Sequence, residues 1–249
     1  MKFVMIQKKD GIATLMLSRG KVNALNGIVI DELRSVLKSM ECDVEVRSIV
    51  LTGLGKFFSF GFDVQEFLSF KKEEFSGYLA DFADFYTYLF LYPKPIVAAL
   101  NGHAIGGGCM LALACDHRVM ASGKAKISLN EISFGSSVFA GSVEMLRFWA
   151  GSANATQVLY SGAMYSAEEA RNLGLVQGVT TVDDNIEVAT RVASDLALKR
   201  QPAFAGLKSL LRKPIAEEMM RREGQSIKEF IEIWYSEATM ADLQNIKIY

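Results

Sequence analysis

Residues 95–116 read Pro-Ile-Val-Ala-Ala-Leu-Asn-Gly-His-Ala-Ile-Gly-Gly-Gly-Cys-Met-Leu-Ala-Leu-Ala-Cys-Asp. The apolar run 96–100, closed by the turn pair Asn101-Gly102, predicts a short buried strand. An Ala/Leu-rich helix is expected to begin at about Cys109, directly after three glycines. Glycines that open a helix leave its first amides uncovered at the positive end of the helix dipole. The stretch therefore suits an oxygen that carries, or develops, negative charge.

A phosphate site is a poor match to the same glycines. No lysine, serine or threonine follows them where a phosphate-binding loop needs one, and their spacing differs from the dinucleotide-binding fingerprint. A developing oxyanion fits better than a phosphate chain. The alternative that remains is structural, in which the triplet 106–108 only permits a helix and a strand to pack closely.

Composition excludes several classes of protein. Half of the 249 residues are hydrophobic, yet no apolar run has the length of a membrane span, and the formal charge of -1 offers nothing to nucleic acid. The three cysteines, Cys42, Cys109 and Cys115, lack metal-ligand spacing, so we expect no metal site and a reducing compartment. The first residues lack signal character, and residues 247–249 are not a peroxisomal address. The expected location is cytoplasmic, with no nucleic-acid or membrane partner.

The order of elements predicts an α/β fold. Strands and helices alternate up to about residue 180, and helices finish the chain. The expected strands are 3–7, 12–17, 44–52, 96–100, 117–121, 126–129 and 175–179. The expected helices follow Asn26, cover 64–92, begin near Cys109, cover 142–149 and 153–160, follow Ser166, cover 186–200 and fill the chain after Pro202. We expect a core domain over 1–195 and a helical region over 196–249.

Three motifs together resemble the crotonase, or enoyl-CoA hydratase/isomerase, family. They are the stretch at 101–109 followed by Cys115-Asp116, the turn Phe-Ser-Phe-Gly-Phe-Asp at 58–63, and the segment 159–176. The resemblance implies a crotonase-like spiral of ββα units with a helical C-terminal trimerisation region. It also implies an acyl-CoA thioester substrate, coenzyme A as part of that substrate and not as a cofactor, and a homotrimer or dimer of trimers.

The resemblance further implies an oxyanion hole of two backbone amides, which fall on Phe62 and Gly107. The physical chemistry agrees, because the α-protons of a thioester are only weakly acidic. Removing one requires stabilisation of the enolate oxygen as it forms, and losing one donor of this kind costs roughly 2.7 to 4 kcal/mol in comparable sites.

The acids indicate which reaction follows. Hydratases of this family carry two glutamates, and here the first position is Met110, which neither transfers a proton nor holds a water firmly. The second is retained as Glu131 in Ser-Leu-Asn-Glu. This pattern is most like the Δ3,Δ2-enoyl-CoA isomerases. Glu131 would take a proton from C2 and return it at C4, and burial beside Met110 is expected to raise its pKa.

Several alternatives stay open. Glu131 could be a helix cap or a surface carboxylate, and Glu144 could approach the pocket from the next helix. Asp63 and Asp116 are expected to anchor turns or helix ends, and His103 and His117 to be packing residues. Other reactions to consider are hydration, thioester hydrolysis and decarboxylation, and a non-catalytic CoA-thioester binder is the remaining class.

The resemblance also places substrate contacts. Pantetheine and nucleotide are expected along residues 21–24 and 59–64, with Lys21 or Arg19 near phosphate, and the Phe-rich segments with Phe139 form an apolar acyl wall. A lysine of the C-terminal helix commonly reaches CoA in this family, and Lys247 is the candidate here. The expected substrate-contacting residues are Lys21, Val22, Ala24, Ser59, Gly61, Asp63, Val64, Gly106, Met110 and Phe139.

Overall fold

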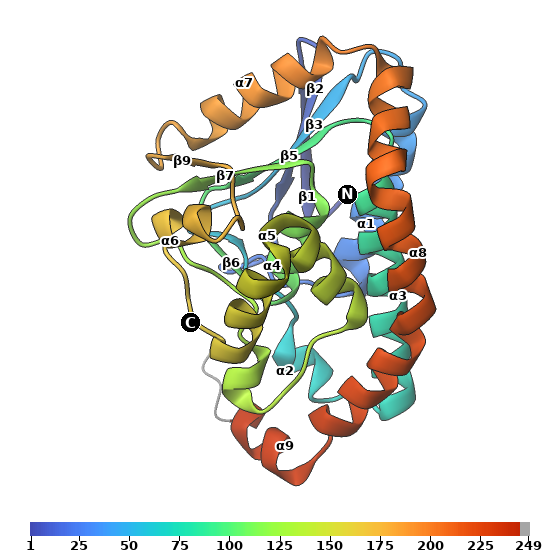
Figure 1. The fold of residues 1–249 in the computed structure, drawn as a ribbon, viewed down its shortest axis with the longest axis vertical. Coiled ribbons are helices and arrows are strands. Elements are labelled where there is room, and N and C mark those ends of the chain that lie inside the picture. Colours follow the sequence, from blue (N-terminus) through green and yellow to red (C-terminus); the bar gives the residue numbers. More distant parts are fainter. Residues whose placement is uncertain (245–249) are drawn as a thin grey trace.

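The computed structural model describes residues 1–244, in which six strands form the larger of two sheets (Figure 1). The hairpin of β1 (Val4–Lys9) and β2 (Ile12–Leu17) is antiparallel and turns at Asp10 and Gly11, which both have positive φ. The other strands join in parallel, in the order β1-β2-β3-β5-β7-β9. They are β3 (Ser48–Gly53), β5 (Ile96–Leu100), β7 (His117–Ala121) and β9 (Gly178–Thr180).

A smaller parallel sheet carries the second strand of each repeat. Its order is β4-β6-β8, with β4 (Phe57–Ser59), β6 (His103–Ile105) and β8 (Ile127–Ser128). Each of the pairs β3-β4, β5-β6 and β7-β8 therefore sends its first strand to the larger sheet and its second to the smaller one. This is the spiral of ββα units that the family resemblance implies.

Helices cover the larger sheet on both faces. On one side, α7 (Asn185–Ala197) lays Ala189 and Ala193 on Val50 and Val97. The main core lies on the other side, against α1 (Gly27–Glu41), α3 (Lys72–Leu91) and α4 (Gly107–Ala114). As predicted, Asn26 caps α1, and its side chain accepts from the Val29 amide at 3.2 Å. The strand predicted from residue 44 begins only at Ser48, because the residues before it form a turn and Val44 is exposed.

The predicted helix over 64–92 is two helices. The first is the short α2 (Val64–Phe67), capped by Asp63, whose side chain accepts from the Glu66 amide at 3.2 Å. The chain then turns, and α3 begins with a new cap in which Glu74 accepts from the Lys71 amide at 2.8 Å. Two separate capping arrangements explain the break, which hydrophobic periodicity alone does not reveal.

The segments between β8 and β9 place the remaining elements of the core. The 3-10 turn η1 (Glu131–Phe134) follows β8. Next comes α5 (Ala140–Ser161), which is interrupted at Gly151 with φ 74°, in agreement with the two helices expected there. The short α6 (Ala167–Asn172) has the predicted capping box of Ser166 and Glu169.

The C-terminal helices pack on the same chain. The long α8 (Gln201–Trp234) runs along α3 and α5, and α9 (Glu237–Gln244) follows it beside η1 (Figure 1). Buried Ile227, Phe230, Ile231 and Trp234 form the predicted apolar stripe. Although α8 has 34 residues, no described helix is both long enough and apolar enough to cross a bilayer. The division at residues 195 and 196 stays a prediction.

Candidate active site

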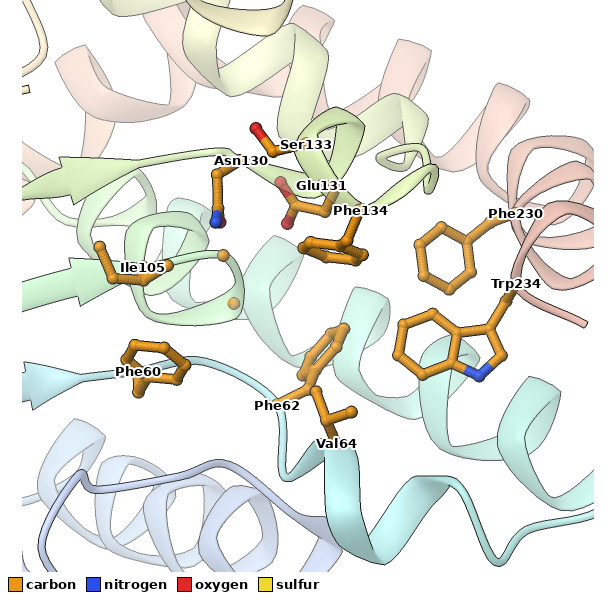
Figure 2. A pocket seen from close by; sticks show the side chains of 12 residues that line it. Phe60, Phe62, Val64, Ile105, Asn130, Glu131, Ser133, Phe134, Phe230 and Trp234 are labelled. Atoms are coloured by element: carbon orange, nitrogen blue, oxygen red, sulfur yellow. The ribbon is translucent and has the colours of Figure 1, made fainter. Parts of the chain in front are cut away.

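All three strands of the smaller sheet end at one cavity of about 300 Å³. Phe60 follows β4, Ile105 is the last residue of β6, and Asn130 and Glu131 come shortly after β8. The carboxyl ends of parallel strands meet at one edge, where α/β folds commonly bind ligands. The cavity is lined by Phe60, Phe62, Val64, Ile105, Gly106, Gly107, Asn130, Glu131, Ser133, Phe134, Phe230 and Trp234 (Figure 2).

Two glycine turns meet beside the cavity with no side chain between them. Gly61 has φ 89°, and a Cβ atom on it would lie 2.6 Å from the Ile105 carbonyl oxygen and 2.9 Å from the Gly107 nitrogen. The Ser59 hydroxyl supports this turn, because it accepts from the Gly61 amide at 3.1 Å and donates to the Asn23 carbonyl at 2.8 Å. Only glycine allows this approach of backbone to backbone.

The amides that follow these glycines are free to bind an oxygen. In the described part of the chain, neither the Phe62 N–H nor the Gly107 N–H has a hydrogen-bond acceptor, and both residues line the cavity. Gly107 is the first residue of α4, whose early amides have no partner within the helix and lie at its positive end. The arrangement can donate two hydrogen bonds to one negatively charged oxygen.

Glu131 is the single carboxylate among the described residues that line the cavity. Its side chain faces the cavity (Figure 2), and the residue is only 7% exposed. The Oε2 atom has no hydrogen-bond partner within residues 1–244, and Oε1 lies 3.3 Å from where a Cβ on Gly106 would stand. Burial raises the pKa of this carboxyl to about 8, although a hydrogen bond from the backbone of Glu131 itself opposes the shift. Glu131 can therefore give and take a proton near neutral pH.

Some of the other residues predicted to contact substrate line the cavity, and the rest lie outside its lining. Val64 and Gly106 line it, together with the proposed oxyanion residues. Ser59, Gly61 and Asp63 instead build the turn, where Asp63 caps α2 and pairs with Arg19 at 2.7 Å. They do not belong to the lining.

The loop 21–24 supports the same turn from outside. The Val22 carbonyl accepts from the Phe60 amide at 2.9 Å, and the Ala24 carbonyl accepts from Arg19 at 3.1 Å. Val22 and Ala24 are buried, Lys21 is exposed, and none of the three lines the cavity. Arg19 also pairs with Glu66, at 3.1 Å. Two carboxylates therefore hold the guanidinium group that was predicted to lie near a phosphate of CoA.

Met110 and Phe139 lie behind the cavity wall and not in it. Both are completely buried, Met110 within α4. The Phe139 ring packs behind two lining rings, with centroids 6.1 Å from Phe62 and 4.8 Å from Phe230. Neither residue is among those that line the cavity, and their contact with substrate stays a prediction. Lys247, the predicted C-terminal contact to CoA, lies outside the described residues.

Several lining residues were not predicted as site residues: Phe60, Ile105, Asn130, Ser133, Phe134, Phe230 and Trp234. Phe60 and Asn130 stand inside quoted motifs, so their proximity could have been inferred. Phe230 and Trp234 belong to a stripe that sequence alone assigns only to packing. Nothing in a helical period tells which buried position faces a cavity.

The remaining acids have structural partners. Glu144 pairs with Arg222 at 2.5 Å and with Arg147 at 3.4 Å, away from the cavity. Asp116 holds Lys208 at 2.8 Å and Arg212 at 3.1 Å, which agrees with the anchoring role expected of it. Within residues 1–244, no group of three or more His, Cys, Asp or Glu side chains is placed to hold a metal ion.

Comparison with known proteins adds to this geometry. The family model described as enoyl-CoA hydratase/isomerase matches residues 7–239. A probable enoyl-CoA hydratase of Bacillus subtilis is 39% identical over 203 residues, 80% of this chain and 78% of that protein. A probable enoyl-CoA hydratase of Rhizobium meliloti is 33% identical, covering 89% and 84%. The structure of human mitochondrial Δ3-Δ2-enoyl-CoA isomerase superposes with a TM-score of 0.93 over 98% of this chain and 96% of that one, at 24% identity, which establishes a common fold.

Proposed function

The chain belongs to the enoyl-CoA hydratase/isomerase family, and within it we propose that this protein converts a 3-enoyl-CoA into the trans-2-enoyl-CoA. The observation that carries the proposal is that Glu131 faces the cavity and that no second acidic side chain is among the described residues that line it. A 1,3-proton transfer needs one group that accepts a proton and then returns it. Addition of water is commonly served by two acids that hold the water between them.

The proton transfer is divided between Glu131 and the two amides. Ionised Glu131 removes a proton from C2, the electron pair moves into the thioester, and the Phe62 and Gly107 N–H groups donate to the resulting enolate oxygen. Protonated Glu131 then returns the proton at C4. The double bond shifts from C3–C4 to C2–C3, into conjugation with the thioester, and no atom is gained or lost. The raised pKa of Glu131 supports this role, because its acid and base forms are both populated near neutral pH.

Position 110 supports isomerisation over hydration. Methionine stands where a hydratase has its first glutamate, and its side chain is buried in the core outside the cavity. Asn130 and Ser133 are the uncharged polar side chains of the lining, and neither can act as an acid or base. Hydration remains the second candidate function, because the curated relatives described above are named hydratases.

We also propose, from the family resemblance, that the protein is a homotrimer or a dimer of trimers and acts in the cytoplasm without a separate cofactor. Exposed apolar side chains on α8, among them Leu207, Leu210 and Leu211, support association of some kind. Light scattering of the purified protein measures its mass directly, and a monomer at micromolar concentration would contradict the trimer.

The deciding experiment offers the purified protein a trans-3-enoyl-CoA and, separately, the trans-2-enoyl-CoA. Isomerisation produces a conjugated thioester, seen by absorbance, without a change of mass. We expect the wild-type protein to form that product, and we expect Glu131→Gln to form it at least about 100-fold more slowly. The matched control is Glu168→Gln, an exposed carboxylate on α6, which should leave the rate unchanged. Gain of one water by the 2-enoyl substrate at a comparable rate would favour the hydratase.

A further inference from the structure

The cavity has an aromatic end formed by the last turns of α8. Figure 2 shows Phe230 and Trp234 closing the side that lies away from Ile105 and Phe60, while Glu131 and Phe62 lie between the two ends. Phe134 and Val64 complete the apolar surroundings of this half. The indole nitrogen of Trp234 points away from Glu131, so the benzo edge of the ring faces the cavity. An acyl chain directed from Glu131 toward this end of the cavity would meet these two rings.

A second layer of buried rings supports that end. Phe230 packs on Phe139 with centroids 4.8 Å apart and on Trp234 at 5.6 Å. Trp234 packs on Phe75 at 4.9 Å, and both Phe75 and Phe139 are completely inaccessible to solvent. Interiors packed in this way resist displacement, since moving one ring requires its neighbours to move. The two lining rings cannot swing aside without opening the core.

Hydrogen bonds hold the end of α8 in register with the cavity. The Tyr235 hydroxyl, one residue beyond Trp234, donates to the Phe70 carbonyl at 2.7 Å, between α2 and α3. Farther back, the Ser226 hydroxyl accepts from the Ala140 amide at 3.0 Å, and the Glu223 carboxylate accepts from the Gly141 amide at 2.6 Å. On either side of Phe230, the helix is thus tied to the segment between α2 and α3 and to α5.

We propose that Phe230 and Trp234 set the acyl-length limit of this protein and restrict it to acyl-CoA thioesters of short to medium chain. The turnover part of this inference rests on the proposed function, whereas the limit on acyl length rests on the shape of the cavity alone. A volume of about 300 Å³ is at the small end for a ligand pocket. The thioester takes part of this room, and the two rings border the rest at one end of the cavity. We therefore place the limit between an octanoyl and a dodecanoyl chain.

The test compares acyl lengths in binding and in turnover. Kd values for saturated butyryl-, octanoyl- and dodecanoyl-CoA need no reaction, so they report on the limit even if isomerisation is disproved. We expect dodecanoyl-CoA to bind at least tenfold more weakly than octanoyl-CoA. Phe230→Ala and Trp234→Ala should remove that difference, and in turnover should raise the ratio of kcat/KM for a C12 over a C6 3-enoyl-CoA at least tenfold.

Two further variants separate the limit from general damage. Ile231→Ala removes a buried side chain from the same turn of α8 that does not line the cavity, so it should leave the length profile unchanged. Trp234→Phe keeps an aromatic ring and should shift the profile less than Trp234→Ala. The proposal is overturned if wild-type protein binds dodecanoyl-CoA as tightly as octanoyl-CoA, or if Ile231→Ala shifts the profile as much as Phe230→Ala.

Discussion

A Cβ atom on Gly61 would lie 2.9 Å from the amide nitrogen of Gly107. The two glycine turns, one after β4 and one after β6, therefore touch through backbone alone. Phe62 follows the first turn, and Gly107 lies within the second. Both residues line the cavity. Their separation is controlled by the absence of a side chain at Gly61, which gives this glycine a role that its neighbours in sequence do not have.

Gly61→Ala should separate the two amides and reduce catalysis. Alanine is strained at φ 89° by about 1 to 3 kcal/mol, and its methyl group would press on the Ile105 carbonyl and the Gly107 nitrogen. Since one such donor is worth about 10² to 10³ in kcat, we expect a loss of about 100-fold or more. The control is Gly77→Ala, on the exposed face of α3 with open space around it, which should be neutral or slightly stabilising. Full activity in a folded Gly61→Ala protein would refute the assignment of these amides.

The activity should depend on pH through Glu131. Because burial raises the pKa of this carboxyl to about 8, its ionised form becomes scarce below that pH. If the ionised form starts the reaction, kcat/KM rises about tenfold per pH unit on the acid side and levels off near pH 8. Initial rates measured between pH 5.5 and 9 with a 3-enoyl-CoA test this. A profile that is flat down to pH 5 would mean that Glu131 is not the base, or is not buried in the free enzyme.

The same group should make the protein less stable as pH rises. The carboxyl has a higher pKa in the folded state than its ordinary value of 4.5. Between pH 4.5 and about 8, the native state therefore binds more protons than the unfolded state does. Its stabilising contribution is complete below about pH 4.5 and is lost as pH rises through about 8. Neutral Glu131→Gln avoids that loss, and each unit of pKa shift corresponds to about 1.4 kcal/mol. We expect the variant to gain about 1 to 4 kcal/mol over wild type between pH 5 and 8.

Thermal unfolding of both proteins across that range measures the effect. Glu168→Gln serves again as the control, because its carboxyl is exposed and its substitution should give parallel curves. A constant difference in Tm between wild type and Glu131→Gln, or one that shrinks with rising pH, contradicts the prediction.

Asp116→Asn should loosen the attachment of α8. The Asp116 carboxylate accepts from Lys208 and from the Ile96 amide, each at 2.8 Å, and pairs with Arg212 at 3.1 Å. The three side chains of this ion-pair cluster are almost completely buried. Neutralising the acid leaves two buried cations without their counter-charge, at a cost of about 3 to 5 kcal/mol. At roughly 2 to 4 °C per kcal/mol, Tm should fall by about 6 to 20 °C.

The surface substitution Asp183→Asn is the control for that change and should move stability by less than about 0.5 kcal/mol. A fall in Tm no larger than that of the control would show that α8 is held mainly by its apolar stripe.

Local sequence was sufficient for much of the fold. Asn26, Ser166 and the Asp10-Gly11 pair mark helix starts and a hairpin because their effect depends on neighbours three residues away or fewer. The glycines at 61 and 106–108 were recognisable for a similar reason, since their spacing is a property of the chain itself. The break between α2 and α3 was missed because apolar residues continue across it, and only the capping by Asp63 and by Glu74 reveals two helices.

The sequence by itself determined the α/β class, the two glycine turns and the identity of Glu131 as a candidate acid. It also determined most of the order of elements, but it missed strand β4 and the break between α2 and α3. Only the tertiary structure decided what surrounds that acid. Phe230 and Trp234 reach the cavity from α8, while Met110 turns into the core, and no period in the sequence distinguishes these outcomes. The pKa of Glu131 depends on the same assembly, because desolvation is the combined effect of groups that distant segments bring together. A helical stripe specifies that a face is buried, and the packing of the other elements specifies what it is buried against.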